Sequence, residues 1–321
     1  MRRTPLARVL VNEPKRHHYL PQMYLRGFAQ GERVWVYDRE KSEYREQGIA
    51  DTAVQRDYYT VIDASGAKNR DFEGILAGIE GKAAEAIRLA DARALLTAEQ
   101  RAALAVFVAL LKVRTPNFEK SFADAQDQLF KKVLKATMNS EERIAASIAA
   151  YERDKGEKLP LAPKELLDLF QGGQFRIEPH RNQSVALMIE LSSEFALLLA
   201  QMDWVFAHAA DGSQFITSDV PFGIIPPRDW KPEGLLGGVG IITPGAVKAI
   251  PLTGRTLLLA FDKGEITRHA DMTEAVVREF NLATTARTER FTIGKDRALL
   301  ESLIPAAGIN KPGIGPRMRV D

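Results

Sequence analysis

Residues 15–28, KRHHYLPQMYLRGF, hold two adjacent histidines, three basic residues, two tyrosines and a phenylalanine. Pro21 follows the histidines closely, and a residue before proline favours extended backbone. Proline also suits the first position of a helix. The stretch therefore predicts an extended segment that carries His17 and His18, followed by a short helix over residues 21–28. No other stretch is as dense in groups that can bind a ligand or transfer a proton.

Runs rich in β-forming residues follow this stretch and return in the last third of the chain. Residues 33–37 alternate as a strand does, and Tyr44 begins its expected partner. Asp211-Gly212 separates two later runs, and this dipeptide is a strong signal for a two-residue hairpin. The further strand candidates are residues 58–62, 204–208, 214–218, 249–252 and 256–261.

Residues between the two β-rich parts show helical periodicity and capping signals. The last helix of this part is apolar nearly all round from Val185 onward, which predicts a buried central helix. A final helix is expected from a cap at Asp271 to about residue 287. The middle helices are expected over residues 72–90, from Thr97 to about 114, 118–133, after Asn139, after Pro163, and over 181–202.

The sequence thus predicts an α+β fold, with N-terminal and C-terminal β-sheets around a helical middle of about six helices. No linker divides the 321 residues, so we expect a single domain over residues 1–321. Its consecutive parts are a loose arm (1–14), a β-rich module with the histidine motif (15–70), the helical middle (71–202), a β-rich part with the final helix (203–309) and a tail (310–321).

Composition excludes several classes of protein. With 45% hydrophobic and 27% charged residues the chain is globular, and a net charge of +2 is too small to indicate nucleic-acid binding. The chain has no cysteine, which excludes disulfides, a thiolate nucleophile and cysteine metal ligands. P-loop, H-E-x-x-H and G-x-S-x-G motifs are absent, as is a strand-flanked G-x-G-x-x-G.

The expected location is the cytoplasm. The absence of cysteine fits a reducing compartment. Residues 1–14 lack the apolar core of a signal peptide. Apolar runs such as residues 102–111 are too short to cross a bilayer, so we expect no membrane partner.

His17 and His18, with Tyr19 beside them, are the first candidates for catalysis. Neighbouring side chains of an extended segment point to opposite faces, so we expect one histidine in a site and the other packed or orienting. An imidazole titrates near pH ~6.5 and can act as a general base. The alternative is a buried imidazole that hydrogen-bonds to backbone. His180 and His269 are isolated in sequence and are expected at the surface.

Glu73 and Glu80 form the second candidate group. They are seven residues apart, so they lie about 20° from each other on one helix face. This face borders the apolar stripe of the helix, where an uncompensated charge is costly. We therefore predict that both carboxylates point inward. Their partner is either a metal ion or the arginines Arg56 and Arg70, which would make a brace that docks the helix on the sheet.

The third candidate group is Thr217, Ser218 and Asp219. Here an apolar strand ends in two hydroxyls and a carboxylate, and Pro221 prevents its regular continuation. Asp219 is a candidate catalytic residue. The alternative is a turn in which these short polar groups bond nearby backbone N–H groups.

These stretches resemble a family of uncharacterised, mainly bacterial proteins, the domain of unknown function 4238. The resemblance spans nearly the whole chain in order, implies one continuous domain and supplies no activity. Val220 stands where a polar residue, often Asn, is expected in the family pattern. The matching residues are His17-His18-Tyr19-x-Pro21, Tyr24-Leu25-x-x-Phe28, Trp35-x-Tyr37-Asp38, Arg56-Asp57-x-Tyr59-Thr60, Glu73, Glu80, Arg114-Thr115-Pro116, Ile216-Thr217-Ser218-Asp219-x-Pro221 and Asn281.

Two functions fit these residues. The first is a metal-assisted hydrolase of phosphodiesters, such as a nuclease, with a histidine as general base or ligand. The second is a non-enzymatic module that binds a ligand or partner, in which the carboxylates are structural. A hydrolase requires the histidine motif, Glu73 or Glu80, and Asp219 to converge in one cleft. In it, Asp57, Glu73, Glu80 and Asp219 would hold Mg²⁺ or Mn²⁺, and Lys15, Arg16, Arg56, Thr217 and Ser218 would bind an anionic substrate or nucleic acid.

Overall fold

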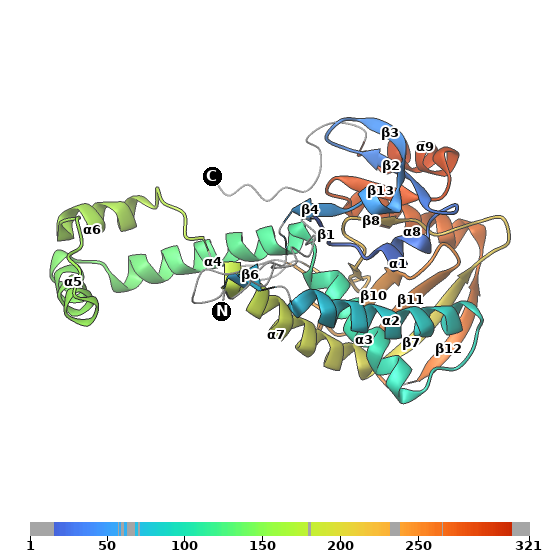
Figure 1. The fold of residues 1–321 in the computed structure, drawn as a ribbon, viewed down its shortest axis with the longest axis horizontal. Helices are drawn as coiled ribbons and strands as arrows, with labels where there is room; N and C mark the ends of the chain where they lie inside the picture. Colours follow the sequence, from blue (N-terminus) through green and yellow to red (C-terminus); the bar gives the residue numbers. More distant parts are fainter. Residues whose placement is uncertain are drawn as a thin grey trace, which may run out of the picture. The chain divides into compact units, whose positions relative to one another are not determined.

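The computed structural model describes residues 16–56, 58, 61–62, 68–69, 71–178, 181–231, 238–264 and 266–309. Half of the chain is helical and about 20% is in strands, with strands towards both ends and helices in the middle, which confirms the α+β fold. The chain divides into two compact units (Figure 1). Unit 1 comprises Met1–Thr115 and Val185–Asp321, and unit 2 comprises Pro116–Ser184. The expected single domain stays a prediction, because this division does not say whether unit 2 folds alone.

The extended segment with the histidines and the short helix after it are both present. The first strand pairs antiparallel with a strand from the same module, so that His17 lies opposite Gln55. The helix is shorter than the predicted residues 21–28: it begins at Gln22, with Pro21 as its N-cap instead of its first residue, and ends at Arg26. These elements are β1 (Arg16–His18), α1 (Gln22–Arg26), the 3-10 turn η1 (Ile49–Asp51), β4 (Val54–Arg56), β5 (Val61–Ile62) and β6 (Lys68–Asn69).

Two larger sheets form the core of unit 1. The four-stranded sheet has the order β3-β2-β13-β8 and joins the N-terminal part of the chain to the last third. The five-stranded sheet has the order β12-β7-β11-β10-β9, and only its β12–β7 pair is parallel. The strands are β2 (Arg33–Asp38), β3 (Glu43–Gly48), β7 (Met202–Ala209), β8 (Thr217–Ser218), β9 (Gly223–Ile225), β10 (Val247–Pro251), β11 (Thr256–Lys263), β12 (Thr267–Met272) and β13 (Phe291–Gly294).

The predicted hairpin at Asp211-Gly212 is wrong. The turn forms, with Gly212 at φ +81°, but β7 pairs with β11 and β12 instead of the segment after the turn. That segment leaves the sheet, and its short strand β8 pairs with β13. Phe215 packs on the five-stranded sheet while Ile216 packs with the helix after β13. The dipeptide set the local turn, and long-range burial of two large side chains decided the pairing.

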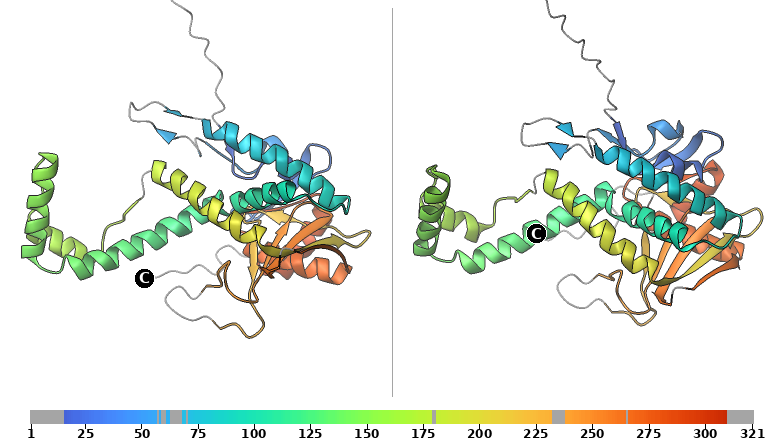
Figure 2. Two further views of the ribbon diagram at one scale, coloured as in Figure 1. Left: turned by 90° about the horizontal axis from the view of Figure 1, so that it is seen from below. Right: turned by 60° about the horizontal axis from the view of Figure 1, so that its bottom comes forward.

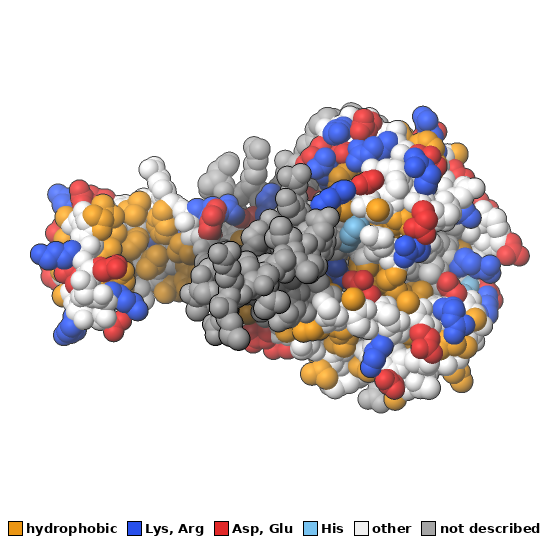
Figure 3. Space-filling view, in the orientation of Figure 1, with side chains coloured by type: hydrophobic (Ala, Val, Ile, Leu, Met, Phe, Trp, Pro, Cys, Tyr) orange, Lys and Arg blue, Asp and Glu red, His pale blue; other side chains and the backbone are white. Residues whose placement is uncertain are grey.

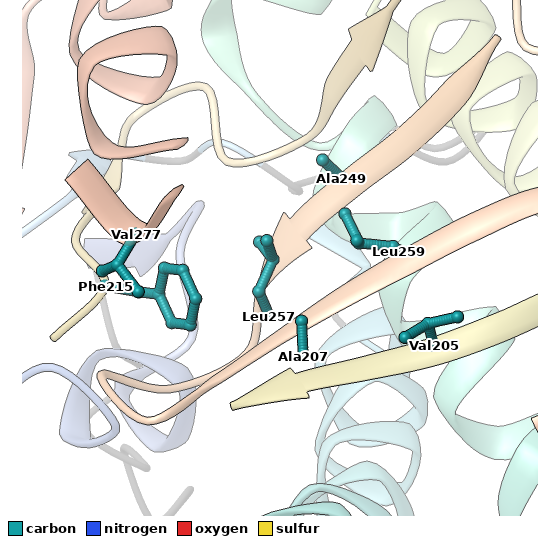
Figure 4. Close-up of a cluster of buried hydrophobic side chains, with 7 residues drawn as sticks. All are labelled: Val205, Ala207, Phe215, Ala249, Leu257, Leu259 and Val277. Atoms are coloured by element: carbon teal, nitrogen blue, oxygen red, sulfur yellow. The ribbon is translucent and has the colours of Figure 1, made fainter. Parts of the chain in front are cut away.

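Both faces of the five-stranded sheet are covered by helices (Figure 2). On one face Arg101 of α3 stacks over Trp204, with its Cζ 4.1 Å from the ring centroid. On the other face, Val277 of α8 joins Phe215 in a cluster of buried apolar side chains (Figure 4). The helices of unit 1 are α2 (Asp71–Asp91), α3 (Ala98–Val113), α7 (Arg181–Ala200, in unit 1 from Val185), α8 (Glu274–Arg287) and α9 (Arg297–Ala306).

Helix α7 is not the buried central helix that its apolar sequence predicted. One stripe is buried, while Ile189 and Leu197 are exposed. In the described part of the chain it is the one helix long and apolar enough to cross a membrane, and 28% of Asn182–Ala200 is buried. Core helices of soluble proteins meet the same criteria, so the expected absence of a membrane partner stays a prediction. The buried stripe consists of Val185, Met188, Ser192, Ala196 and Leu199.

Unit 2 contains α4 (Pro116–Thr137), α5 (Glu141–Lys155) and α6 (Pro163–Gly172). Among the described residues of these three helices, only Ile144 is buried. Hydrophobic side chains gather on the visible surface of this unit (Figure 3). The expected cap of α5 at Asn139 is displaced by one residue to Ser140, whose hydroxyl accepts from the Arg143 N–H.

Candidate functional site

A cleft of about 450 Å³ in unit 1 lies beside the histidine motif, at β1, α1, α2 and the end of α3. Most of its other lining residues are small or apolar. Its charged or titratable lining consists of three arginines, two histidines and one glutamate: Arg16, His17, His18, Arg26, Glu80 and Arg114.

His17 and His18 both line the cleft, whereas one of them was expected to be packed away. The strand alternation survives in their burial, because His17 is buried and His18 is half-buried. The Nε2 of His18 lies 3.1 Å from the Ala50 carbonyl oxygen. A carbonyl only accepts, so Nε2 carries the proton and Nδ1 of the neutral ring keeps its lone pair. Burial lowers the pKa of His18 against the opposing hydrogen bond from Ala50, and this favours the neutral ring.

Arg114 and Glu80 form the most buried ion pair of the cleft. Arg114 Nη1 donates to Glu80 Oε1 at 2.9 Å, and Nη2 donates to the His18 carbonyl at 2.6 Å. The side chain of Arg114 is 3% exposed and that of Glu80 is 23% exposed. One guanidinium thus ties β1, α2 and α3 together. The inward orientation predicted for Glu80 is confirmed, with Arg114 rather than Arg56 or Arg70 as its described partner.

The other two arginines are tied more loosely. Arg16 pairs with Asp51 at 2.8 Å, and Arg26 pairs with Glu32 at 3.0 Å. Their side chains are 52% and 49% exposed, and neither acidic partner lines the cleft. These two cations therefore face solvent at the rim of the site, where exposed ion pairs are weak.

Tyr19 is buried and packs away from the cleft lining. Its backbone N–H donates to the Ala53 carbonyl at 3.0 Å, which extends the pairing of β1. Its ring meets that of Tyr58 edge-on, with centroids 6.4 Å apart. These contacts give Tyr19 a role in packing the β-rich module.

Thr217 joins the two large sheets instead of lining the cleft. The Tyr24 hydroxyl donates its one proton to the Pro251 carbonyl at 2.8 Å. Thr217 Oγ1 lies 2.7 Å from the same hydroxyl oxygen, so it must be the donor of that second bond. Ser218 Oγ accepts from the Val220 N–H at 3.1 Å. Both hydroxyls are buried and engaged. The Ser218 bond is the local contact to a backbone N–H that the turn-like alternative expects, whereas the partner of Thr217 is a distant side chain.

Asp219 is not among the residues that line the cleft. Its carboxylate accepts the backbone N–H groups of Glu289 and Arg290, at 3.2 Å and 2.7 Å. Burial raises the pKa of Asp219 to about 7, against the backbone hydrogen bonds that lower it. The side chain therefore holds the loop before β13. The histidines and Glu80 line one cleft but Asp219 does not, so the full convergence that a hydrolase requires is not found.

Several expected site residues cannot be placed. Lys15, Asp57 and Arg70 lie outside the described residues, as do the side chains of Arg56 and Glu73. Within the described residues no group of three or more His, Asp or Glu side chains is arranged to hold a metal ion. Mg²⁺ or Mn²⁺ as a cofactor therefore stays a prediction.

Sequence reasoning missed two arginines of the cleft and a partly buried histidine pair. Arg114 appeared in the family pattern, but its partner lies 34 residues away in sequence. His269, expected at the surface, packs against His208, with Nε2 of His208 2.9 Å from Nδ1 of His269. The parallel pairing of β12 with β7 brings them together, and no local pattern indicates it.

The chain matches the family described as protein of unknown function (DUF4238) over residues 16–298. It therefore belongs to this family, and the resemblance seen in the motifs is confirmed. No curated protein and no solved structure matches the chain.

Proposed function

We propose that the cleft beside the histidine motif binds an anionic ligand, and that the protein is a binding module. The observation that supports this is the charge of the lining: three arginines against one glutamate, with that glutamate held by Arg114. Arg16 and Arg26 remain available at the rim. The volume of about 450 Å³ falls within the range of small-molecule sites.

The arginine pairs at the rim can be exchanged for ligand contacts at low cost. Exposed ion pairs contribute only about 0–1 kcal/mol each. A phosphate or carboxylate offers a guanidinium two oxygens in the geometry of its planar fork, which is stronger than a screened contact at the surface. Asp51 and Glu32 can then turn towards solvent.

The same cleft supports a second candidate, a metal-assisted hydrolase of phosphodiesters. The observation in its favour is that His18 and Glu80 line one cleft and that Nδ1 of His18 keeps a lone pair. A general base needs such a lone pair within reach of the attacking water. The required metal would depend on Asp57 and Glu73 as further ligands, with a nucleic acid as one substrate. A cytoplasmic location is part of both proposals.

Calorimetric titration with inorganic phosphate and with a mononucleotide tests the binding proposal. The double variant Arg16→Gln/Arg26→Gln should weaken mononucleotide binding at least tenfold, since a charged hydrogen bond is worth about 1.5–3 kcal/mol. Arg33→Gln/Arg297→Gln is the matched control, because both arginines are similarly exposed and ion-paired but lie outside the cleft lining. Equal affinity in the two double variants would refute the proposal.

Hydrolysis is tested separately with a chromogenic phosphodiester and Mg²⁺ or Mn²⁺. The hydrolase candidate expects metal-dependent turnover in the natural chain and its loss in His18→Gln, with the fold monitored by circular dichroism. Turnover that is absent with both metals, beside intact mononucleotide binding, leaves the binding module as the function.

A further inference from the structure

A second pair of cations lies away from the cleft, between the end of α3 and the end of α8. Lys112 belongs to the last turn of α3, and its Nζ lies 5.6 Å from the centroid of the Phe222 ring. Arg287 is the last residue of α8. Both side chains are partly buried, so solvent still reaches them. Positions 112 and 114 lie about 200° apart around a helix, so Lys112 faces away from the side of Arg114 and the cleft.

Gly223 makes room for the Arg287 guanidinium. A Cβ atom at Gly223 would lie 2.5 Å from Cζ of Arg287, so the guanidinium lies directly against the glycine backbone. Nη2 donates to the Thr284 hydroxyl at 3.2 Å. Nε is buried and has no hydrogen-bond partner within the described residues. The guanidinium is therefore held in place with donor capacity to spare.

The two charges are close enough to repel each other. Burial lowers the pKa of Lys112, and the neighbouring Arg287 lowers it further. Burial also lowers the pKa of Arg287 to about 10. Within the described residues Arg287 forms no ion pair with a carboxylate. Buried charges in proteins are normally paired, and an unpaired one is costly.

We propose that Lys112 and Arg287 form a binding site for a phosphate group, seated against Gly223 and Phe222. Two neighbouring cations match a phosphate, which carries about 1.5–2 negative charges at neutral pH, better than a single carboxylate. The planar guanidinium donates two parallel hydrogen bonds to such an oxyanion, and the ammonium adds a point charge. The phosphate places negative charge beside both cations and so relieves the repulsion between them. The site is distinct from the cleft of the proposed function.

Calorimetric titration with inorganic phosphate at constant ionic strength, set with chloride, tests this site. Arg16→Gln/Arg26→Gln removes the cleft from the measurement and should leave phosphate binding at the Lys112–Arg287 site. Adding Arg287→Gln to that background should abolish the remaining binding. Gly223→Ala, which displaces the guanidinium without changing any charge, should weaken it at least tenfold. Arg278→Gln is the matched control, an exposed arginine on the same helix that bonds Ser302.

Each result decides the proposal. Phosphate binding that survives Arg287→Gln and Gly223→Ala overturns it, and so does a cleft variant that binds no phosphate. If Arg287→Gln fails to fold, Lys112→Gln takes its place, with the same expected loss. Binding lost only in the cleft variant would uphold the proposed function while rejecting this site.

Discussion

Helix α3 ends with two cations, two positions apart, whose surroundings differ. Arg114 meets a carboxylate and a backbone carbonyl, which complete its hydrogen bonds within the fold. Lys112 lies near a second cation, Arg287, which forms no ion pair within the described residues. The comparison separates two uses of buried charge. A cation with partners in the fold holds elements together, whereas a buried cation such as Arg287, without an ion pair among the described residues, keeps an attraction for an anion from solution.

The largest expected effect is the loss of stability on replacing Arg114, the cation that has partners within the fold. Arg114→Met should lower the free energy of unfolding by about 3 kcal/mol, because it strands the Glu80 carboxylate and the His18 carbonyl. This is the lower end of the usual range, since Glu80 keeps some contact with water. Urea denaturation measures the loss. The double variant Arg114→Met/Glu80→Met should recover part of the lost stability. An Arg114→Met variant as stable as the natural chain would contradict a structural role of the Arg114–Glu80 pair.

Asp219 extends the comparison to a buried carboxylate that backbone N–H groups hold, with no cationic partner among the residues that the structure describes. Asp219→Asn should cost about 1–3 kcal/mol, because an amide cannot accept both N–H bonds. Asp262→Asn, an exposed side chain that accepts one backbone N–H from Gly245, is the control and should cost less. Mononucleotide binding in the cleft should not change.

Asp219 also predicts a pH dependence. Its folded-state pKa of about 7 lies above the ordinary value of 3.8, so the folded chain binds the proton more tightly. The contribution of Asp219 to stability is therefore greatest below pH ~4 and is lost as pH rises to about 7. Asp219→Asn should remove this slope from a plot of unfolding free energy against pH. An unchanged slope would show that Asp219 is ionised throughout.

The His208–His269 pair should give a smaller slope of opposite sign. Burial lowers the pKa of His208, and Arg93 and His269 lower it further, against Asp271 and Asp91. The unfolded chain therefore binds the proton first, and stability falls as pH drops below the unfolded value of about 6.5. His208→Gln should flatten that acid limb in melting experiments between pH 7.5 and 5. If stability falls equally with pH in the natural and variant chains, His208 is not the group responsible for that fall.

The smallest expected effect on stability follows from replacing Arg287. Without phosphate, Arg287→Met should leave the free energy of unfolding unchanged or raise it by up to about 1 kcal/mol, since it removes a buried charge and strands no carboxylate among the described residues, only the neutral Thr284 hydroxyl. The contrast with Arg114→Met, measured in the same urea series, is the direct test of the comparison. A loss as large as that of Arg114→Met would mean that Arg287 is structural.

Local signals in the sequence predicted what local interactions decide. Thr97 and Gln100 form the expected capping box, and α1 begins within one residue of its predicted start at Pro21. His17, His18 and Glu80, three of the predicted site residues, line the candidate cleft, and their functional roles stay a prediction. Arg114 was not assigned to the site, because a contact across 34 residues leaves no trace in a short window.

The failures share one physical cause, competition from distant parts of the chain. Asp271 was expected to cap α8, but it belongs to β12 and pairs with β7, so Thr273 caps the helix instead. The Asp211-Gly212 turn does not close a hairpin, because the segments before and after it pair in two different sheets. Helix α7 is apolar nearly all round from Val185 onward, yet only one stripe of it is buried in the core.

The Tyr24 hydroxyl imposes an order on the folding of the chain. Its two partners, Thr217 and Pro251, follow it by 193 and 227 residues, and the ring itself is buried. During synthesis α1 must therefore wait, unpacked, until the five-stranded sheet has left the ribosome. Contacts of such long range slow folding. A chain released before residue 251 would leave the histidine motif without its support, and such a fragment would be a natural target for chaperones.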